Sequence, residues 1–273
     1  MSEISIQKDH ANLLWTGGWD STFQLLQLLL IYKCSVSPFY LIHEDRPSTG
    51  IEIKTMKDIK NYIIKNYPHT KELFFPTQFH GVGDILPNND ITSAYHLILK
   101  KCHIGSQYEW LSRFCKERRI KDMHLSVRNP FKSKENNLDE IFNNMLIRDV
   151  VNSQSIYKLD PDNKNSNIFI LFKYFVLPIR MFTKVQMNEI ALSKGWKNIM
   201  DLTWFCQNPT YNEKPCGICT PCQQKINSGL EWRIPPARRA LSLYYRRLFW
   251  PSKAVIRSTL IKLGLYSNKN DAL

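Results

Sequence analysis

The residues best suited to chemistry lie near the start of the chain, in Leu13-Leu14-Trp15-Thr16-Gly17-Gly18-Trp19-Asp20-Ser21-Thr22. An apolar run over residues 11–15, interrupted only by Asn12, predicts a short buried strand, and the apolar run over residues 23–32 predicts a helix. A strand joined to a helix by glycines exposes backbone N–H groups that suit a phosphate. We therefore expect an anion-binding loop between these two elements.

Each residue type in this loop has a chemical use. The expected nucleotide-binding set is Thr16, Gly17, Gly18, Trp19, Asp20, Ser21 and Thr22. The two glycines let the backbone approach an anion without a Cβ in the way, and the three hydroxyls add donors. Asp20 is an acid in a site for anions, so we expect it to act through Mg²⁺. The alternative is a plain tight turn, in which Asp20 caps the helix.

A second group able to do chemistry consists of cysteines. Four of the seven are spaced C-x9-C-x2-C-x2-C, at Cys206, Cys216, Cys219 and Cys222. Four sulfurs at this spacing satisfy tetrahedral Zn²⁺ with no open position, which is the pattern of a structural site. An iron–sulfur cluster also takes four thiolates and is the alternative. Cys34, Cys102 and Cys115 are isolated on apolar segments, where we expect core packing.

Composition limits the class of protein. The chain has 273 residues, 43% of them hydrophobic, which is enough for a sizeable core in one or two domains. A net charge of +13 favours acidic partners: nucleotides, nucleic acid or an acidic protein. Residues 1–12 lack a signal-peptide pattern, and no apolar run reaches the roughly 18 residues of a membrane span. We expect a cytoplasmic protein without membrane contact, in which clustered cysteines indicate metal rather than disulfides.

The elements that must position these groups alternate along the chain. Strands are expected at residues 11–15, 36–43, 73–75 and 123–127 and within 168–179. Helices are expected at residues 23–32, 51–67, 91–101, 107–119 and 138–151, with loops at 76–90 and 129–137 and a polar, exposed stretch at 153–167. This alternation predicts an α/β fold, a parallel sheet with helices on both faces. Ligands would then bind at the carboxyl ends of the strands, where the glycine loop lies.

Loop and cysteines together resemble the 7-cyano-7-deazaguanine (preQ0) synthase family of PP-loop ATP pyrophosphatases. The family's Ser-Gly-Gly-x-Asp-Ser loop appears here with Thr16 in place of the first Ser. The stretch 177–190, with Phe182-Thr183-Lys184, is similar to its Pro-containing stretch ending in Thr-Lys. The family's Thr-Trp-Ser-Cys is similar to Leu202-Thr203-Trp204-Phe205-Cys206. Its Cys-Gly-x-Cys-x2-Cys is similar to the segment that starts with Pro215-Cys216-Gly217-Ile218-Cys219 and ends at Cys222, and its following basic residue is near Lys225. The resemblance covers about residues 13–229.

The resemblance implies a PP-loop fold, an adenine nucleotide alpha-hydrolase-like sheet of Rossmann type. It also implies ATP, Mg²⁺, a four-cysteine Zn²⁺ site and often a homodimer. The family activates the carboxylate of 7-carboxy-7-deazaguanine as an acyl-adenylate; ammonia makes the amide, and a second ATP dehydrates it to the nitrile. We expect Asp20, Ser21 and Lys184 to be catalytic, and domains at residues 1–200 (ATP), 201–230 (zinc) and 231–273 (a basic helical extension).

The chain departs from the family in its middle. The family has an Arg-Asn pair before a helix and a Tyr-Pro-Asp-Cys-Arg loop after the fourth strand. Here the corresponding segments are residues 105–108 and 128–132. Gln107 and Tyr108 are the expected purine contacts, whereas Trp110 is expected in the core. The departures put the substrate, or the fate of the activated substrate, in question.

Other polar residues give weaker signals. His43 and Glu44 end the second strand beside the expected nucleotide, although plain loop roles suit them better. His103 and His124 have no metal-ligand spacing, so we expect satisfied histidines.

The C-terminal segment is strongly basic. From Glu231 to the end there are nine Lys or Arg and only two acids, Glu231 and Asp271, so this segment carries +7 of the total charge of +13. An apolar stripe of Leu241, Tyr244, Tyr245, Leu248 and Phe249 at helical spacing accompanies Arg246 and Arg247. This predicts either a docking surface for an acidic protein or nucleic acid, or a packed helix with a solvated basic face.

Three functions fit the sequence. The first is an ATP-dependent C–N ligase that adenylates a deazapurine-type carboxylate and releases AMP and pyrophosphate. In the second, a protein amine captures the same acyl-adenylate and becomes modified; similar divergent members belong to antiphage defence operons, a setting suggested by analogy. The third is a nucleotide-binding module without catalysis, which the intact Gly17-Gly18 and Asp20-Ser21 disfavour.

Overall fold

The computed structural model describes residues 9–101, 104–127, 142–151, 154–227 and 229–248. Two compact units divide the chain. The first consists of residues 1–45 and 49–204, and the second of residues 46–48 and 205–273. The expectations for Cys102, His103 and residues 128–132 lie outside the described residues, as do those for residues 249–273.

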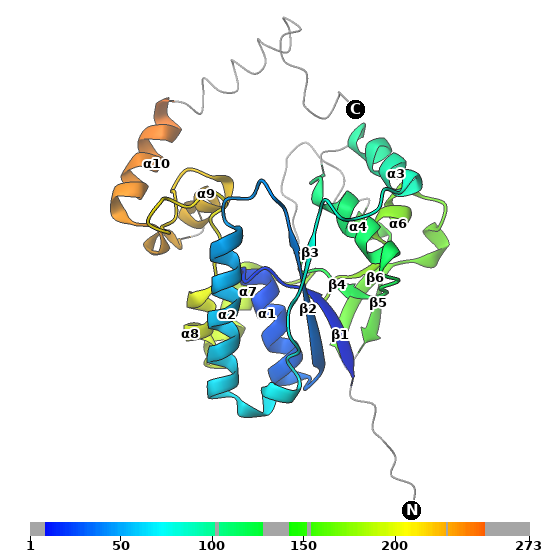
Figure 1. Cartoon of the computed structure of the whole chain (residues 1–273), viewed down its shortest axis with the longest axis horizontal. Helices are drawn as coiled ribbons and strands as arrows, with labels where there is room; N and C mark the ends of the chain where they lie inside the picture. Colours follow the sequence, from blue (N-terminus) through cyan, green and yellow to red (C-terminus); the bar gives the residue numbers. More distant parts are fainter. Residues whose placement is uncertain (1–8, 102–103, 128–141, 152–153, 228, 249–273) are drawn as a thin grey trace, which may run out of the picture. The chain divides into compact units, whose positions relative to one another are not determined.

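A five-stranded parallel sheet forms the centre of the first unit, in the order β3-β2-β1-β4-β7 (Figure 1). Its strands are β1 (His10–Leu14), β2 (Ser35–Ile42), β3 (Gln78–Gly81), β4 (Met123–His124) and β7 (Phe175–Val176). Leu13 pairs with Pro38 of β2 and with His124 of β4. Strand β1 is therefore central, and the loop after it opens at the middle of the carboxyl edge.

Helices cover both faces of the sheet (Figure 1). One face carries α1 (Trp19–Leu26) with a following π-helical turn (Gln27–Ile31), α2 (Thr49–Asn66), α7 (Lys184–Ser193) and α8 (Lys197–Leu202). The other carries α3 (Asn89–Leu99), α4 (Gln107–Glu117) and α6 (Asn167–Phe172). Consecutive residues of β1 serve different cores: Leu13 packs with α1, and Leu14 with α3 and α4. The predicted α/β class with a parallel sheet is confirmed.

Two expectations about the middle of the chain are wrong. Residues 146–151 were expected in a helix and 153–167 in an exposed polar stretch, but β5 (Leu146–Val151) and β6 (Gln154–Leu159) pair antiparallel. Strand β6 buries Ile156 completely. The β-branched residues Ile147 and Val150 suit a strand better than a helix, and this local signal outweighs the helical spacing.

The third strand also lies later than expected. Residues 73–75 make only an isolated parallel bridge, between Val36 and Phe74, after a 3₁₀ turn (Pro68–Glu72). Strand β3 forms instead at Gln78–Gly81, inside the expected loop. An edge strand has one pairing partner and exposed side chains, such as Gln78 and Phe79, so it lacks the apolar run of a buried strand.

The second unit is small and mostly helical. It contains α9 (Thr220–Asn227), a 3₁₀ turn (Glu231–Arg233) and α10 (Pro236–Leu248); the first unit adds a further 3₁₀ turn (Pro161–Asn163). A helix in the basic segment was expected, and α10 confirms it. Among the described helices, none combines the length and the apolar content that crossing a membrane would need.

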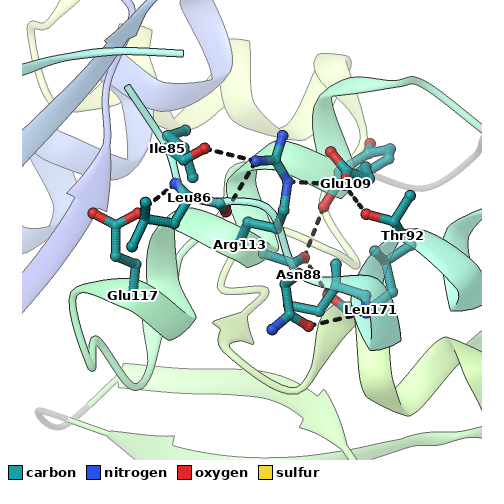
Figure 2. Close-up of polar contacts among 11 residues, drawn as sticks. Ile85, Leu86, Asn88, Thr92, Glu109, Arg113, Glu117 and Leu171 are labelled. Carbon is teal, nitrogen blue, oxygen red and sulfur yellow. Dashed lines mark hydrogen bonds and ion pairs between the residues drawn. The ribbon is translucent and has the colours of Figure 1, made fainter. Parts of the chain in front are cut away.

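A half-buried ion pair fixes α4 to the loop that follows β3 (Figure 2). Arg113 donates to the Glu109 carboxylate at 2.8 Å and to the carbonyls of Ile85 and Leu86 at 2.9 and 3.0 Å. Glu109 also accepts from the Thr92 hydroxyl at 2.6 Å, which joins α3 to the network. One guanidinium thus holds three segments together.

Replacing Arg113 with methionine is expected to lower the free energy of unfolding by about 2–3 kcal/mol, because Glu109 and two carbonyls lose a charged donor. Lys116→Met on the same helix is the control: Lys116 is exposed and lies 3.8 Å from Asp90, and such pairs contribute about 0–1 kcal/mol. Urea unfolding followed by circular dichroism measures both. Equal losses in the two variants would contradict the role assigned to Arg113.

Candidate functional site

The turn between β1 and α1 is set by a backbone conformation that favours glycine. Gly17 has a φ of +66°, in the left-handed region. A Cβ built on Gly17 would lie 3.1 Å from Thr55 Cγ2 and 3.2 Å from Met56 Cγ, both on α2. Conformation and crowding therefore both favour glycine, and the turn lies directly against α2.

Helix α1 begins immediately after this turn. Gly18 is its N-cap residue, and the Thr22 N–H donates to the Gly18 carbonyl at 3.0 Å. That bond is the first of the helix, so the amides before it have no acceptor within the helix. Amides at such a position favour a bound anion, and the helix dipole adds to the effect. A helix starts directly after the glycine turn, as expected, and phosphate binding there stays a prediction.

Some side chains of the loop hydrogen-bond within it, and others are more exposed. The Ser21 hydroxyl donates to the Gly18 carbonyl at 3.3 Å and accepts from the Thr16 N–H at 3.4 Å. The buried Thr22 hydroxyl accepts from the Trp15 indole at 3.1 Å. Thr16 is exposed, while Trp19 and Asp20 are half-buried. Ser21 and Thr22 therefore shape the loop, and Thr16 is more accessible to a ligand than Asp20, whose Oδ1 atom is buried.

A segment far along the chain closes one side of the turn. The Trp204 N–H donates to the Gly17 carbonyl at 3.0 Å, and a Cβ on Gly18 would lie 3.8 Å from the Trp204 carbonyl oxygen. Thr203 is buried beside it, and its hydroxyl donates to the Met200 carbonyl at 2.6 Å. Trp204, of the Thr-Trp pair named in the resemblance, is thus in direct contact with the glycine turn. Motif spacing gave no signal of this contact.

Lys184 is the first residue of α7, on the same face of the sheet as α1. Thr183 and Gln186 form a capping box that fixes this helix start. The preceding Phe182 packs edge-on against Phe23 of α1, with ring centroids 5.9 Å apart. Lys184 itself is half-buried. The packing places it at a helix start beside α1, and its role at the phosphates stays a prediction.

The expected substrate residues begin α4, on the other face of the sheet. Gln107 is exposed, whereas Tyr108 is 5% exposed and packs against Phe172 at 5.0 Å between ring centroids. Trp110 packs against the same core, as expected. A substrate role for Gln107 and Tyr108 stays a prediction, and the burial of the Tyr108 ring weakens it for that residue.

A buried polar network joins α1 to the sheet and to the hairpin. The Gln24 amide lies 3.1 Å from His124 Nδ1, and Gln24 and Gln154 exchange hydrogen bonds of 2.8 and 3.1 Å. Burial lowers the pKa of His124 to about 4, so it is neutral near pH 7. His124 is a satisfied histidine, as expected. Sequence reasoning missed both glutamines, because nothing in their spacing marks them as buried.

The four clustered cysteines form a compact set in the second unit. Their sulfurs all lie within 4.8 Å of one another. The sulfurs of Cys206 and Cys219 are 3.8 Å apart, and those of Cys216 and Cys222 are 3.9 Å apart. A tetrahedral ion with bonds of about 2.3 Å places its sulfurs about 3.8 Å apart, so the set fits one ion. A [4Fe–4S] cluster binds each thiolate through a different iron and needs wider spacing.

The clustered cysteines influence one another's protonation. The hydrogen bond between Cys206 and Cys219 lowers the pKa of Cys219 and raises that of Cys206. A metal needs deprotonated ligands, so the four cysteines would bind it as thiolates. In contrast, Cys34 and Cys115 are buried in the cores as expected, and burial raises the pKa of Cys115 to about 12.

The cysteine turn is locked to α10. Gly217 has a φ of +83°, and a Cβ there would lie 2.5 Å from the Arg238 carbonyl oxygen. Gln223 of α9 donates to the Gly217 carbonyl at 2.8 Å and to the buried Ser242 hydroxyl at 2.6 Å. Helix α10 therefore packs on the cysteine turn through its Ser242 face. It exposes Leu241, Leu243 and Tyr244 on the remainder.

Two cations flank an aromatic ring beside Cys206. The buried Lys225 ammonium lies 5.6 Å from the Phe205 ring centroid, and the Arg233 guanidinium lies 5.2 Å from it. Four thiolates on a divalent ion carry a net charge of −2, and nearby cations reduce the cost of burying that charge. Lys225, which the resemblance sets near the family's following basic residue, is thus buried in the same unit as the four cysteines.

Comparisons with known proteins find likenesses among solved structures alone. No protein-family model and no curated protein matches the chain. Among solved structures, the chain is similar to the U34-tRNA thiolase NcsA from Methanococcus maripaludis with its [4Fe-4S] cluster. The TM-score is 0.40 at 12% identity, and the match covers 90% of this chain and 75% of that one. A likeness of this size leaves function to the residues themselves.

Replacing Cys219 with serine is expected to remove the metal and lower the melting temperature, because a structural ion contributes folding energy. Metal analysis of the purified wild type should find about one zinc per chain. Cys34→Ser is the matched control, since its sulfur donates to the Asp9 carbonyl at 3.1 Å and a hydroxyl can replace it. If the purified wild type contains no metal and Cys219→Ser leaves the melting temperature unchanged, the metal site is contradicted. If the wild type contains iron and sulfide, the cysteines bind an iron–sulfur cluster and not zinc.

Proposed function

We propose that this chain is an ATP-dependent enzyme that adenylates a carboxylate and releases AMP and pyrophosphate. The observation that carries the proposal is the Gly17-Gly18 turn at the carboxyl end of the central strand, with α1 starting directly behind it. A parallel α/β sheet binds ligands at this edge. The loop lacks the spacing of the Walker motif and the three glycines of the dinucleotide fingerprint, which favours the PP-loop reading.

The chemistry assigns a role to each part of the loop. The amides at the start of α1 hold the β- and γ-phosphates, and the Ser21 hydroxyl keeps the turn closed. Asp20 would hold Mg²⁺, which supplies charge neutralisation at the phosphates. A carboxylate oxygen attacks the α-phosphorus, the bond to the β-phosphate oxygen breaks, and pyrophosphate leaves. Lys184 neutralises the charge that develops.

The proposed substrate is a deazapurine-type acid similar to 7-carboxy-7-deazaguanine. Support comes from the combination of the glycine turn, the Thr203-Trp204 contact and the four-cysteine set, which together match the resemblance. Ammonia attacks the acyl carbon of the adenylate, AMP departs, and the amide forms. The amide oxygen then attacks the α-phosphorus of a second ATP and releases pyrophosphate, and departure of AMP with that oxygen, with loss of protons from the nitrogen, gives the nitrile.

Loss of Asp20 or of the Ser21 hydroxyl is expected to lower AMP formation by roughly 10²–10³-fold, because Asp20 would hold the Mg²⁺ that neutralises developing charge and Ser21 keeps the turn that presents the amides closed. Chromatography of nucleotides after incubation with Mg²⁺-ATP and 7-carboxy-7-deazaguanine measures it. Asp162→Ala, an exposed carboxylate outside the loop, serves as control and should match the wild type. ADP as the product, or full activity in both loop variants, refutes the mechanism.

The second candidate function is transfer of the acyl group to a protein amine. The observation that favours it is the exposed part of α10, where Leu243 and Tyr244 are 64% and 62% exposed beside arginines. An apolar surface next to positive charge suits an acidic protein partner. A protein amine takes the place of ammonia as the nucleophile, and the adenylation step before it is the same.

Substitution of Leu243 and Tyr244 together by serine is expected to abolish acylation of a protein while leaving AMP formation with ammonia unchanged. Intact-mass spectrometry of proteins and of small molecules in the same reaction separates the two outcomes. Ser242→Ala is a structural control, since Ser242 faces the cysteine turn. Protein adducts that persist in the double variant exclude α10 as the docking surface, and nitrile alone excludes the second candidate.

A further inference from the structure

A buried hydroxyl at the carboxyl edge of the sheet has no assigned role. Within the part of the chain that the structure describes, Ser126 Oγ is buried and makes no hydrogen bond. Leaving a buried polar atom unpaired costs about 1–3 kcal/mol. Buried polar groups are therefore normally paired, and one that is unpaired in the empty protein is a candidate to pair with a ligand.

Two other unpaired polar atoms lie in less suitable places. Gln27 Oε1 is in the π-helical turn that follows the C-terminal end of α1, whereas the glycine turn precedes its N-terminal end. His80 Nε2 is on the edge strand β3, and its ring packs against Phe39 and Phe114. Ser126 differs because it follows a strand that lies next to β1.

Strand pairing puts Ser126 close to the glycine turn. Leu13 of β1 pairs with His124 of β4. Two residues further along each parallel chain, Ser126 is level with Trp15, the residue before Thr16. The sheet order reverses between these strands, because β2 and β3 lie on one side of β1 and β4 and β7 on the other. Ligands of open α/β sheets bind at the carboxyl edge where the order reverses.

The local backbone turns Ser126 toward the α1 side. His124 faces α1, since it meets Gln24, and Leu125 packs in the opposite core. Continued two residues from His124, the strand alternation would put Ser126 on the face on which α1 begins, level with Trp15. The Val127 N–H donates to the Leu125 carbonyl at 2.9 Å, so Ser126 is the central residue of a tight turn that ends the strand. Such a turn displays its central side chain at the edge.

We propose that the Ser126 hydroxyl binds the AMP half of ATP, at the α-phosphoryl group. This inference rests on the proposed function, because it takes the pyrophosphate half to lie in the Gly17-Gly18 turn. With the terminal phosphates at the start of α1, the α-phosphoryl group lies toward the crevice between β1 and β4, the side on which Ser126 is found. A hydroxyl donating to a non-bridging α-oxygen there stabilises the charge that grows as the substrate attacks.

Separate probes for the two halves of the nucleotide test this assignment. Isothermal titration calorimetry in Mg²⁺ buffer measures the binding of pyrophosphate, AMP and α,β-methylene-ATP. Ser126→Ala is expected to weaken AMP and the methylene analogue by about tenfold or more and to leave pyrophosphate within twofold. Ser126→Thr keeps the hydroxyl and should retain most of the AMP affinity. Ser193→Ala, which loses an exposed helix hydroxyl bonded to the Ile190 carbonyl, is the control.

The outcomes separate this inference from the function on which it rests. If wild type binds all three probes and Ser126→Ala binds AMP equally well, the Ser126 contact is wrong and the loop assignment stands. Equal weakening of AMP and pyrophosphate in that variant also overturns the contact, because it indicates a damaged loop. Wild type that binds neither half overturns both proposals. If the alanine variant fails to fold, Ser126→Cys supplies the same comparison with a weak donor in place of a strong one.

Discussion

The site depends on one backbone conformation, the left-handed turn at Gly17. That turn redirects the chain from the central strand into α1, and it does so in contact with Thr55 and Met56 of α2 and with the Trp204 amide. Three segments distant in sequence therefore meet at one residue that has no side chain. Any Cβ at this point would push on α2, move the start of α1 and displace the amides that face the carboxyl edge. The position of the glycine loop is thus a property of the packed unit and not of the short motif alone.

Sequence patterns predicted the parts of the fold that are buried or repeated. The strand–glycine–helix pattern around Gly17 and Gly18, the buried strand β2 and the long helix α2 each gave a strong local signal, and the structure confirms them. The alternation of strands and helices was enough to predict a parallel sheet covered on both faces. Spacing alone also predicted that the four cysteines could share one ion, because short intervals between ligands leave the chain few other arrangements.

The parts that sequence could not predict depend on distant partners. Edge strand β3 and the β5–β6 hairpin have no continuous apolar run, so pairing rather than propensity decides their structure. Gln24, Gln154 and Ser126 carry no spacing signal, because each becomes notable only when its hydrogen-bond partners are known. The same holds for Tyr108, which looked available for a purine and lies instead in a core. Polar residues are hard to assign from sequence, since burial alone separates a network from a solvated surface.

The central claim is that ATP is cleaved between its α- and β-phosphates to give an acyl-adenylate. Exchange of [³²P]pyrophosphate into ATP tests it most directly, because the label returns only if adenylation is reversible on the enzyme. With Mg²⁺ and 7-carboxy-7-deazaguanine, and without ammonia, the account predicts labelled ATP that depends on the acid. Label that stays in pyrophosphate while ATP is turned over to ADP and phosphate would contradict it.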